Sequence, residues 1–599
     1  MSFPDLRAFL DELRRDGDLV EVSAEVDPQQ EAAEIHRRVV AAGGPALLFT
    51  RPVGADYPLV TNLFGTARRA ELAFGERPQR FIRRLVETVE SALPPTIGSL
   101  WGARDVAAQV LKVGLRRGPR GPVTEVVTDD VRLDRLPALT TWPEDGGPFI
   151  TLPLVFTEHP DGRGHNLGMY RLQVHDAVST GMHWQIGKGG GFHYRVAEDR
   201  GEFLPVTVFL GGPPALTLAA IAPLPENVPE LLLASLIAGE RLGLVEGVGP
   251  HPLVARAEFA LMGTVAPHTR RPEGPFGDHY GYYSLRHDYP VFQVSRMARR
   301  RDAIFPATVV GKPRQEDFFI GDLLQELLSP LFPLVMPGVT DLWSYGETGY
   351  HSLSAAVVKQ RYAREAMASA FRILGEGQLS LTKFLLVTDQ SVDLKDFRAT
   401  LEHVLERTNP ETDLYVFSNL SMDTLDYTGP EVNLGSKGIW LGLGDPVRTL
   451  PGQFSAPELP AGCGPVEVFC RGCLVVGAPP KAEDPDVAGR VASHPAFANW
   501  PLVVLTDEPA RAARSAMNFL WTTFTRFEPA ADVHAAATRV ARNHLVYTPP
   551  IVIDARLAPG FPDELHCDPG VADTVSTRWK DYFPDGRVEM GDAERGHLD

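Results

Sequence analysis

The sequence predicts a multidomain α/β protein, and three observations lead to this fold class. At 599 residues the chain exceeds what one hydrophobic core supports, so two or three domains are expected. Between about residues 123 and 307 short β-like runs are separated by Gly and Pro. After about residue 341, strand-like and helix-like runs alternate, which is typical of βαβ units around a mainly parallel sheet.

The N-terminal region, residues 1–120, is predicted to be a small α/β segment. Its first helix is indicated by Leu6, Phe9, Leu10 and Leu13 at helical spacing, with Gly17 as the stop. Further elements are expected as a helix from 27–28 to 43–44, strands at 47–49 and 59–60, and a helix at 77–93.

Residues 121–312 are predicted to form a barrel-like β domain. Its strands are expected at 152–155, 170–174, 206–210 and 291–294, with a helical insert at 229–238. An apolar helix at 317–331, which Pro330 and Pro333 end, marks a linker at 313–340.

The α/β domain that follows is predicted at 341–490. Strands are expected at 354–358, 384–388 and 414–417, with helices at 362–374 and 394–406. Residues 491–599 form a less regular C-terminal extension, with a helix expected near 531–542 and an extended run at 549–554.

Charge and composition exclude several classes of function. The net charge of −18 argues against a nucleic-acid or anionic-membrane partner, because both require a concentrated basic surface. No run approaches the roughly 18 to 20 uninterrupted apolar residues of a membrane span, and the N-terminus lacks the order of a secretion signal. Four cysteines are too few to staple the chain, so a reducing, cytoplasmic location is expected.

Two segments of the β region carry the residues most suited to chemistry. The first, Asn166-Leu-Gly-Met-Tyr-Arg171, places a neutral oxygen ligand five residues before a fixed cation. The second, Pro272-Glu-Gly-Pro-Phe-Gly-Asp-His-Tyr-Gly281, holds Glu273 and Asp278 on a backbone bent by Gly and Pro. An ordinary arginine is better explained by a surface ion pair, but a rigid loop with two carboxylates favours a joint acid–base cluster.

These two segments resemble the UbiD family of prenylated-FMN-dependent (de)carboxylases. The resemblance begins at Leu6-Arg-Ala-Phe-Leu10, passes through 42–49 and Asn62-Leu-Phe-Gly-Thr66, and continues to Leu434-Gly-Ser-Lys-Gly438, so it covers most of the chain. It implies a split β-barrel flavin-binding domain that a helix links to an α/β domain.

The resemblance also implies catalytic roles. Arg171 would bind the substrate carboxylate, Asp278 would deliver the proton that replaces carbon dioxide, and Glu273 would hold the arginine. A proton donor must stay protonated near neutral pH, and two carboxylates that share one arginine are expected to keep one acid in that state. A second interpretation, in which Glu273 is the donor, stays open.

The family's metal ligands are matched at Asn166 and Glu240, which would hold Mn²⁺ or Mg²⁺, and K⁺ is allowed as a further cation. The family's third ligand, a histidine, falls on Gly187 in this chain. His193 is favoured as the substitute because a Gly-Gly-Gly run could bend it back, while His183 or water remain alternatives.

The flavin site is expected from the same resemblance. Its lining would come from Met169, Tyr170, Arg171, His183, Trp184 and Gln185. Lys188 and Gly189 offer a cation and close backbone N–H groups for the phosphate, although such a run alone is often only a loop. Lys383 would reach the phosphate from the second domain. A nicotinamide cofactor has no support, because no Gly-x-Gly-x-x-Gly run lies between a strand and a helix.

The cysteines are interpreted as buried structural thiols. Cys470-Arg-Gly-Cys473 has zinc-type spacing, but only one such pair occurs; the others are Cys463 and Cys567. A structural metal is the less favoured alternative.

The resemblance implies a non-oxidative, reversible decarboxylase of aromatic or α,β-unsaturated acids. The segments at 549–556, 567–569 and 575–580 resemble the long menaquinone-pathway branch, which acts on a dihydroxynaphthoate. The expected partners are an aryl carboxylate and CO₂, a flavin prenyltransferase that supplies the cofactor, and further copies of the chain in a homodimer or higher oligomer. The alternatives are a cofactor-maturation protein, a carboxylase subunit without activity of its own, and a flavin reductase.

Overall fold

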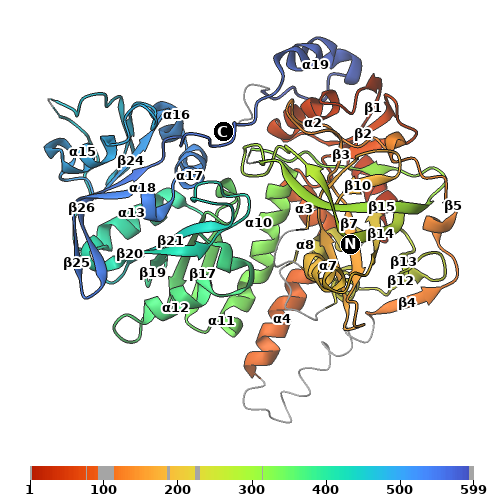
Figure 1. Ribbon diagram of the computed structural model, residues 1–599, viewed down its shortest axis with the longest axis horizontal. Helices are drawn as coiled ribbons and strands as arrows, with labels where there is room; N and C mark the ends of the chain where they lie inside the picture. The colour runs from red at the N-terminus through yellow and green to blue at the C-terminus, as the bar shows by residue number, and fades with distance from the viewer. Residues whose placement is uncertain are drawn as a thin grey trace. The chain divides into compact units, whose positions relative to one another are not determined.

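A computed structural model describes residues 3–75, 77–91, 113–184, 189–222, 229–312, 314–456 and 458–592. It divides the chain into two compact units (Figure 1). The first comprises Met1–Leu327 and the returning segment from Glu564, and the second comprises Leu328–Asp563. The multidomain α/β class predicted from the sequence is confirmed.

The N-terminal segment forms a four-stranded sheet in the order β1-β2-β3-β16. Helix α1 buries Leu6, Phe9, Leu10 and Leu13 as the sequence predicts, and the Asp5 side chain caps its first turn. Because β16 pairs with β3, the end of the predicted β domain completes this sheet. The elements are α1 (Leu6–Arg15), β1 (Leu19–Val26), α2 (Glu31–Ala41), β2 (Ala46–Pro52), β3 (Leu59–Thr61), α3 (Ala67–Phe74), α4 (Arg77–Ser91) and β16 (Phe305–Pro306).

The β region forms a seven-stranded antiparallel sheet, in which β10-β15-β14-β11-β7-β8 are neighbours and β5 pairs with β15. Its two longest strands, β14 and β15, are joined by the loop that carries Asp278. The strands are β5 (Val126–Thr128), β7 (Leu154–Glu158), β8 (His165–Met169), β10 (Ser179–Gly181), β11 (Leu204–Leu210), β14 (Phe259–Glu273) and β15 (His287–Arg299).

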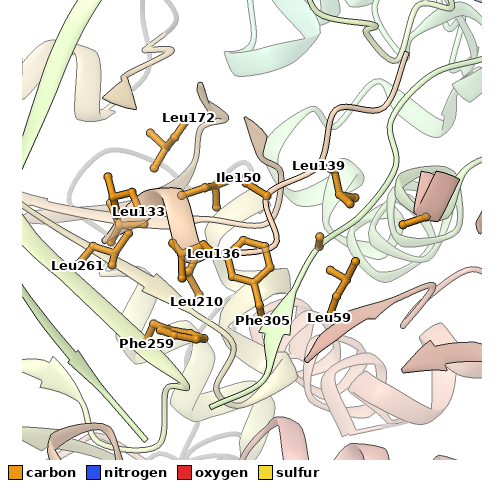
Figure 2. Close-up of a cluster of buried hydrophobic side chains, with 14 of the residues drawn as sticks. Leu59, Leu133, Leu136, Leu139, Ile150, Leu172, Leu210, Phe259, Leu261 and Phe305 are labelled. Atoms are coloured by element: carbon orange, nitrogen blue, oxygen red, sulfur yellow. The ribbon is translucent and has the colours of Figure 1, made fainter. Parts of the chain in front are cut away.

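Smaller elements complete the first unit. They are η1 (Pro122–Thr124), η2 (Leu133–Arg135), the pair β6 (Phe149–Ile150) and β9 (Leu172–Gln173), the sheet of β4 (Leu115–Gly118), β12 (Leu242–Val245) and β13 (Leu253–Val254), and helices α7 (Gly189–Asp199), α8 (Pro214–Ile221), α9 (Glu230–Ala238) and α19 (Pro569–Tyr582). One apolar cluster joins the sheets, since Leu59 and Phe305 lie with Phe259, Leu261 and Leu210 (Figure 2).

The second unit contains two five-stranded sheets, β17-β18-β19-β21-β20 and β22-β23-β24-β26-β25. The centre of each is parallel and its edges are antiparallel. The strands are β17 (Val339–Ser344), β18 (Leu353–Val358), β19 (Phe384–Thr388), β20 (Leu414–Ser421), β21 (Leu434–Gly442), β22 (Val466–Cys470), β23 (Cys473–Gly477), β24 (Leu502–Thr506), β25 (Val533–Ala541) and β26 (His544–Asp554).

The helices of this unit lie between the strands in sequence. They are α12 (Glu365–Leu374), α13 (Phe397–Arg407), α14 (Pro410–Asp413), α15 (Val487–Ser493), α16 (Pro509–Arg514), α17 (Ala516–Phe524), α18 (Pro529–Asp532), and the 3₁₀ turns η4 (Gly346–Thr348), η5 (Gly377–Leu381) and η6 (Pro495–Phe497). The helix predicted near 531–542 is wrong, because these residues form β25 in a hairpin with β26. Ladder pairing to β26 outweighs the local helical preference of the alanines.

The helix predicted at 317–331 is present, as α10 (Glu316–Leu328), which the 3₁₀ turn η3 (Ser329–Leu331) and α11 (Phe332–Val335) follow. By length and composition this run, Glu316–Val335, is the one stretch of described residues able to cross a membrane. One such helix is weak evidence for a span, and acidic residues such as Asp322 and Glu326 interrupt it.

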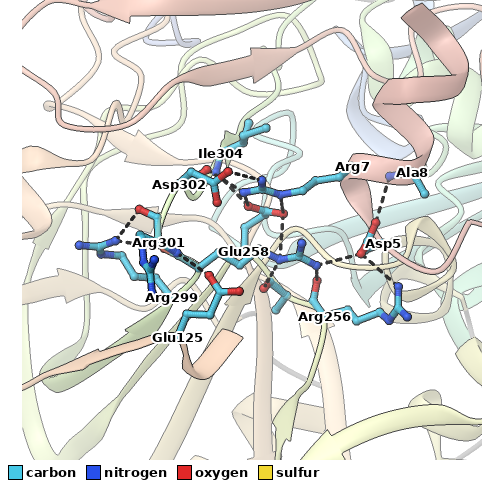
Figure 3. Close-up of polar contacts among 12 residues, drawn as sticks. Asp5, Arg7, Ala8, Glu125, Arg256, Glu258, Arg299, Arg301, Asp302 and Ile304 are labelled. Carbon is cyan, nitrogen blue, oxygen red and sulfur yellow. Dashed lines mark hydrogen bonds and ion pairs between the residues drawn. The ribbon is translucent and has the colours of Figure 1, made fainter. Parts of the chain in front are cut away.

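A buried carboxylate ties α1 to the base of the β14–β15 hairpin (Figure 3). Glu258 is fully buried and accepts hydrogen bonds from Arg7 at 3.1 and 3.0 Å and from the Ile304 amide at 3.0 Å. Arg300 lies 3.3 Å from the same carboxylate and also binds Asp5 at 2.9 Å. The N-terminal segment is therefore joined to the β sheet by charge as well as by apolar packing.

We expect Glu258→Gln to lower the free energy of unfolding by about 3 kcal/mol, because a neutral amide in this buried position takes one anionic partner away from both Arg7 and Arg300. Urea denaturation followed by circular dichroism measures the change. Glu246→Gln is the matched control, since its pair with Arg117 is exposed and is worth at most about 1 kcal/mol. Equal effects of the two substitutions would contradict the assigned role of Glu258.

Candidate active site

The loop that follows β14 is held in place by hydrogen bonds to its backbone. The Asp145 carboxylate accepts hydrogen bonds from the Gly277 amide at 2.8 Å and from the amides of Thr141 and Trp142 at 2.8 and 2.9 Å. The Gln173 side chain donates to the Gly146 carbonyl at 2.6 Å and accepts from the Gly274 amide at 2.9 Å. The loop is thus pinned to the neighbouring chain through its backbone.

The structure brings the three predicted catalytic side chains into one cluster. Arg171 follows β8, Glu273 ends β14, and Asp278 lies in the loop. The Arg171 Nε donates to Glu273 Oε1 at 3.2 Å, and its Nη1 donates to Asp278 Oδ2. Its Nη2 donates to Ser284 Oγ at 3.3 Å, and the guanidinium lies 4.5 Å over the Phe276 ring.

Two imidazoles complete the cluster. The His183 Nδ1 lies 2.7 Å from Glu273 Oε1, and the His279 Nδ1 binds Asp278 Oδ1. Both carboxylates are buried, at 1% and 5% exposure. Glu273 Oε2 and His183 Nε2 are buried without a hydrogen-bond partner among the described residues, so two polar atoms of the cluster are available to a bound molecule.

The pKa values of both carboxyl groups lie below their ordinary range. Burial raises the pKa of Glu273, but its contacts with His183 and Arg171 outweigh burial. Burial likewise opposes ionisation of Asp278, and His279 and Arg171 still hold its pKa far below the usual value. Burial and Arg171 lower the pKa of His183, so its neutral imidazole acts as a hydrogen-bond donor to Glu273.

This differs from the expectation that two carboxylates sharing one arginine would keep one acid protonated. Arg171 is not the only partner that the two acids have. Glu273 also contacts His183, and Asp278 also contacts His279. The described cluster therefore rests with both carboxylates ionised.

The predicted metal side of the site is built on β8 and the start of α7. A Cβ on Gly189 would approach Asn166 Oδ1 to 2.2 Å, so only glycine leaves this amide accessible. The Tyr170 hydroxyl lies 3.4 Å from both the Asn166 amide nitrogen and the Gly190 amide. The indole nitrogen of Trp184 is buried without a partner in the described part of the chain.

Glu230, the first residue of α9, was not predicted as a site residue from the sequence. Its Oε2 is buried, has no hydrogen-bond partner among the described residues, and lies 4.0 Å from His165 Nε2 on β8. Burial raises the pKa of Glu230 to about 7. The sequence does contain a feature that could have identified it. Glu230 is the single acid in the apolar run Glu230-Leu-Leu-Leu-Ala-Ser-Leu-Ile-Ala238, and burial of a charged group costs free energy unless a partner or a metal compensates it.

Glu240, the acid predicted from the sequence, lies past the other end of the same helix and is exposed. Eight steps along α9 lead from Glu230 to the last helical residue, Ala238, which at about 1.5 Å per residue is on the order of 12 Å, and Glu240 lies two residues further on. The described contacts therefore join Glu230, not Glu240, to the strand that bears Asn166.

His193 lies on α7, and its Nδ1 is 2.9 Å from Thr157 Oγ1. Thr157 is the register partner of Asn166 across β7 and β8, which puts His193 on the predicted metal side. Burial, with a smaller contribution from His159, lowers the pKa of His193 to about 4, so its imidazole is neutral. His183 is instead bound to Glu273, and Gln185, Gly187 and Lys188 lie outside the described residues.

The remaining predicted residues fall in two places. Tyr170 and Gly189 lie beside Asn166, and Trp184 lies with Tyr170 beside Gly190. Met169, on β8, packs against a different apolar cluster from Tyr170 and Trp184. Lys383 belongs to the second unit, where it is 2.8 Å from Asp426. Cys470 and Cys473 are buried free thiols that face each other across β22 and β23, and Cys463 and Cys567 are half-buried free thiols. The described residues contain no group of three His, Cys, Asp or Glu side chains that could hold a metal.

Three family models match the chain. They are described as the N-terminal, Rift-related and C-terminal domains of 3-octaprenyl-4-hydroxybenzoate carboxy-lyase, and they match residues 10–89, 116–313 and 318–442. The chain belongs to the UbiD family. As a member of this family, the protein is a carboxy-lyase.

Individual relatives agree with the UbiD assignment. A 4-hydroxybenzoate decarboxylase subunit of Chlamydia pneumoniae is 50% identical over 586 residues, 98% of this chain and 99% of the relative. The vanillic acid decarboxylase of Sedimentibacter hydroxybenzoicus has a TM-score of 0.66 at 24% identity, over 77% of this chain and 97% of its own. HmfF of Pelotomaculum thermopropionicum, a UbiD-class enzyme in complex with FMN, has a TM-score of 0.62 at 24% identity, over 76% and 97%. At this identity the two structures show the shared UbiD fold.

Replacement of Arg171 by Gln tests the electrostatics of the UbiD cluster. In the native protein the lowered pKa values of Glu273 and Asp278 contribute stability above about pH 4, which is lost as the pH falls through those lowered values. Without the cation, His183 and His279 alone oppose the effect of burial, so both pKa values rise and the variant gains less stability from ionisation as the pH rises.

The expected result is a difference in unfolding free energy between native and variant protein that grows from pH 5 to pH 8. Urea denaturation at both pH values measures it, and Arg171→Lys, which keeps a cation, is the control. A difference that is constant or shrinks over this range would refute the assigned charges.

Proposed function

We propose that this UbiD-family chain catalyses the non-oxidative decarboxylation of an aromatic carboxylic acid with prenylated FMN as cofactor. The observation that carries the proposal is Arg171 held between Glu273 and Asp278 on a pinned loop. An α,β-unsaturated acid is the alternative substrate class, because its decarboxylation also leaves an electron pair on carbon that needs an electron sink.

Arg171 is proposed to bind the substrate carboxylate. A guanidinium carries five N–H groups, and the three hydrogen bonds of Arg171 described above use one each on Nε, Nη1 and Nη2. Two N–H groups, one on each terminal nitrogen, are therefore left for a carboxylate, which arginine recognises well.

Substrate binding is also proposed to prepare the proton donor. Decarboxylation consumes one proton for each CO₂ released, yet both acids rest ionised. A third anion beside Arg171 raises the pKa of Glu273 and Asp278, because like charges disfavour ionisation. One of them then takes up a proton and delivers it to the carbon that lost CO₂; Asp278 is the proposed donor, and Glu273, with its unpartnered Oε2 in the described chain, is the alternative.

The cofactor is proposed from the apolar and aromatic residues on β8 and just before α7. When bound, prenylated FMN supplies an electron sink for the pair left on carbon. Met169, Tyr170 and Trp184 offer apolar and aromatic surface for it, together with an indole N–H that has no partner within the described chain. The HmfF enzyme is also described in complex with prenylated FMN, which supports this choice.

A hard cation is proposed at Asn166 and Glu230, in place of the pair Asn166 and Glu240 that the sequence favours. Amide and carboxylate oxygens suit Mn²⁺ or Mg²⁺, and a cation would remove the cost of ionising a buried acid. His193 stays the proposed third ligand through Nε2, because Thr157 engages Nδ1. The substrate would be a hydroxybenzoate, as the relatives' names suggest, or a dihydroxynaphthoate, as residues 549–556 suggest.

A second candidate is a polypeptide that needs a partner protein for turnover. The Chlamydia pneumoniae relative is named as one subunit of its decarboxylase, and this favours the second candidate. The partners proposed in either case are a flavin prenyltransferase and further copies of the chain, in the cytoplasm.

The deciding experiment co-expresses the chain with a flavin prenyltransferase and measures CO₂ release from naphthoates and benzoates. Native mass spectrometry and metal analysis on the same sample report the bound groups. Turnover by the isolated chain supports the first candidate. A loaded flavin without any turnover supports the second, and absence of flavin under these conditions contradicts both.

Glu273→Gln and Asp278→Asn are each expected to reduce turnover by roughly 10²- to 10⁴-fold while flavin content stays near the native level. Each substitution keeps the shape of the side chain but removes its acid–base capacity. Turnover assays and flavin absorbance measure the two effects, and full activity in both variants would sink the assignment.

Glu230→Gln is expected to abolish bound Mn²⁺, because a neutral amide is a weaker ligand for a hard cation. Glu240→Gln, just past the other end of the same helix, is the matched control and should retain the metal. His193→Ala should lower metal content only if this imidazole is a ligand. Elemental analysis of the loaded protein measures the metal content of each variant. Loss of metal in Glu240→Gln alone would contradict the proposal and favour Glu240 as the ligand.

A further inference from the structure

The last part of the chain returns to the first unit beside the acid-bearing loop. We call residues 564–568 the returning arm; it leads into α19, which packs on α2 (Figure 1). Leu565 is fully buried and forms a small apolar cluster with Trp142 and Tyr283. The UbiD family models end at residue 442, so they assign nothing to the arm.

The arm pairs with the loop through its backbone. The Leu565 amide donates to the Gly281 carbonyl at 3.0 Å, and Glu564 forms an antiparallel bridge with Tyr282. The Glu564 carboxylate also lies 2.6 Å from the ammonium group of Lys312, which is 1% exposed. A short stretch of chain is thereby paired with the loop through backbone contacts.

The residues that the arm contacts are the ones that fix Asp278. The Asp278 amide donates to the Tyr282 carbonyl at 3.1 Å, and the Gly281 amide donates to the Asp278 carbonyl at 2.9 Å. Gly277 and Tyr283 form the next bridge, and a Cβ on Gly277 would approach the Trp142 ring to 2.0 Å. Trp142 thus contacts the loop at Gly277 and the arm at Leu565.

We infer that Leu565 and Glu564 are positioning residues for Asp278, so that the C-terminal arm is part of the decarboxylation machinery. This inference rests on the proposed function. Leu565 fills the space between Trp142 and Tyr283, and its amide holds Gly281, so the turn from Asp278 to Tyr282 keeps one conformation. Asp278 then meets Arg171 and the substrate carbon in a single geometry.

Leu565→Ala is the main test. It empties the space beside Trp142 and should let the loop move. Hydrogen–deuterium exchange of residues 277–284 should become faster, and kcat should fall by roughly 10- to 100-fold, because catalysis is sensitive to displacements on the order of 1 Å. KM should change little, since Arg171 still binds the substrate carboxylate. Flavin and metal content should stay at the native level.

Two further variants separate positioning from general damage. Leu565→Met keeps the volume of the side chain and should restore both slow exchange and kcat. Val575→Ala on α19 removes a fully buried apolar side chain that packs in the cluster with α2, and it should leave exchange at 277–284 and kcat unchanged. Glu564→Gln removes the charge that pairs with Lys312 and should give a smaller change in the same direction as Leu565→Ala.

The outcomes distinguish this inference from the proposed function. If no acid is decarboxylated by the native chain, the exchange measurements still test whether the arm holds the loop. Native exchange and native kcat in Leu565→Ala would overturn the inference while the proposed function stands. An equal loss of kcat in Val575→Ala would also overturn it, because the effect would then belong to the fold in general.

Discussion

The interaction on which the site depends is the charge balance around Arg171. Two carboxylates at 1% and 5% exposure cannot stay ionised in a protein interior without compensation, and one guanidinium contacts both. Arg171 follows β8, Glu273 ends β14, and Asp278 lies between β14 and β15, at a point that only a bent loop reaches. The β7–β8 and β14–β15 hairpins must therefore meet in one sheet before the charges can be satisfied.

The same balance gives the cluster its chemical state. His183 contacts Glu273 and His279 contacts Asp278, so the two carboxyl groups do not share a proton with each other. The substrate anion proposed above would add negative charge where the compensation is already shared. The proposed proton uptake follows from that added charge and needs no acid that is protonated at rest.

The chain beyond the family models contributes structure of two kinds. Residues 466–554 build a second five-stranded sheet in the second unit, and the segment from Glu564 returns to the first. The segment is attached to α2 through the Arg38 side chain. Arg38 donates to the Ala572 carbonyl at 2.8 Å and to Ser576 at 2.9 Å, while the buried Glu34 binds Arg37 and Arg38. Such a firm attachment is what an arm needs if it is to hold a catalytic loop.

Sequence reasoning succeeded where the signal is local. The burial of Leu6, Phe9, Leu10 and Leu13 follows from helical spacing, and the strands at 354–358 and 384–388 follow from the alternation of strand-like and helix-like runs. The grouping of Arg171 with Glu273 and Asp278 was also predicted, because two short motifs with a family resemblance carry it. The strand β25 was missed, since its pairing with β26 is decided by a partner and not by its own composition.

The sequence by itself thus determined the family, the α/β class and the identity of the acid–arginine cluster. Only the tertiary structure decided which acid at the ends of α9 meets the strand of Asn166, because Glu230 and Glu240 are both plausible ligands until the direction of the helix against β8 is known. It also decided that both carboxylates rest ionised, and that Leu565 reaches the loop of Asp278 from the far end of the chain. In each case the deciding quantity is a contact between distant segments, and no local pattern of residues encodes such a contact.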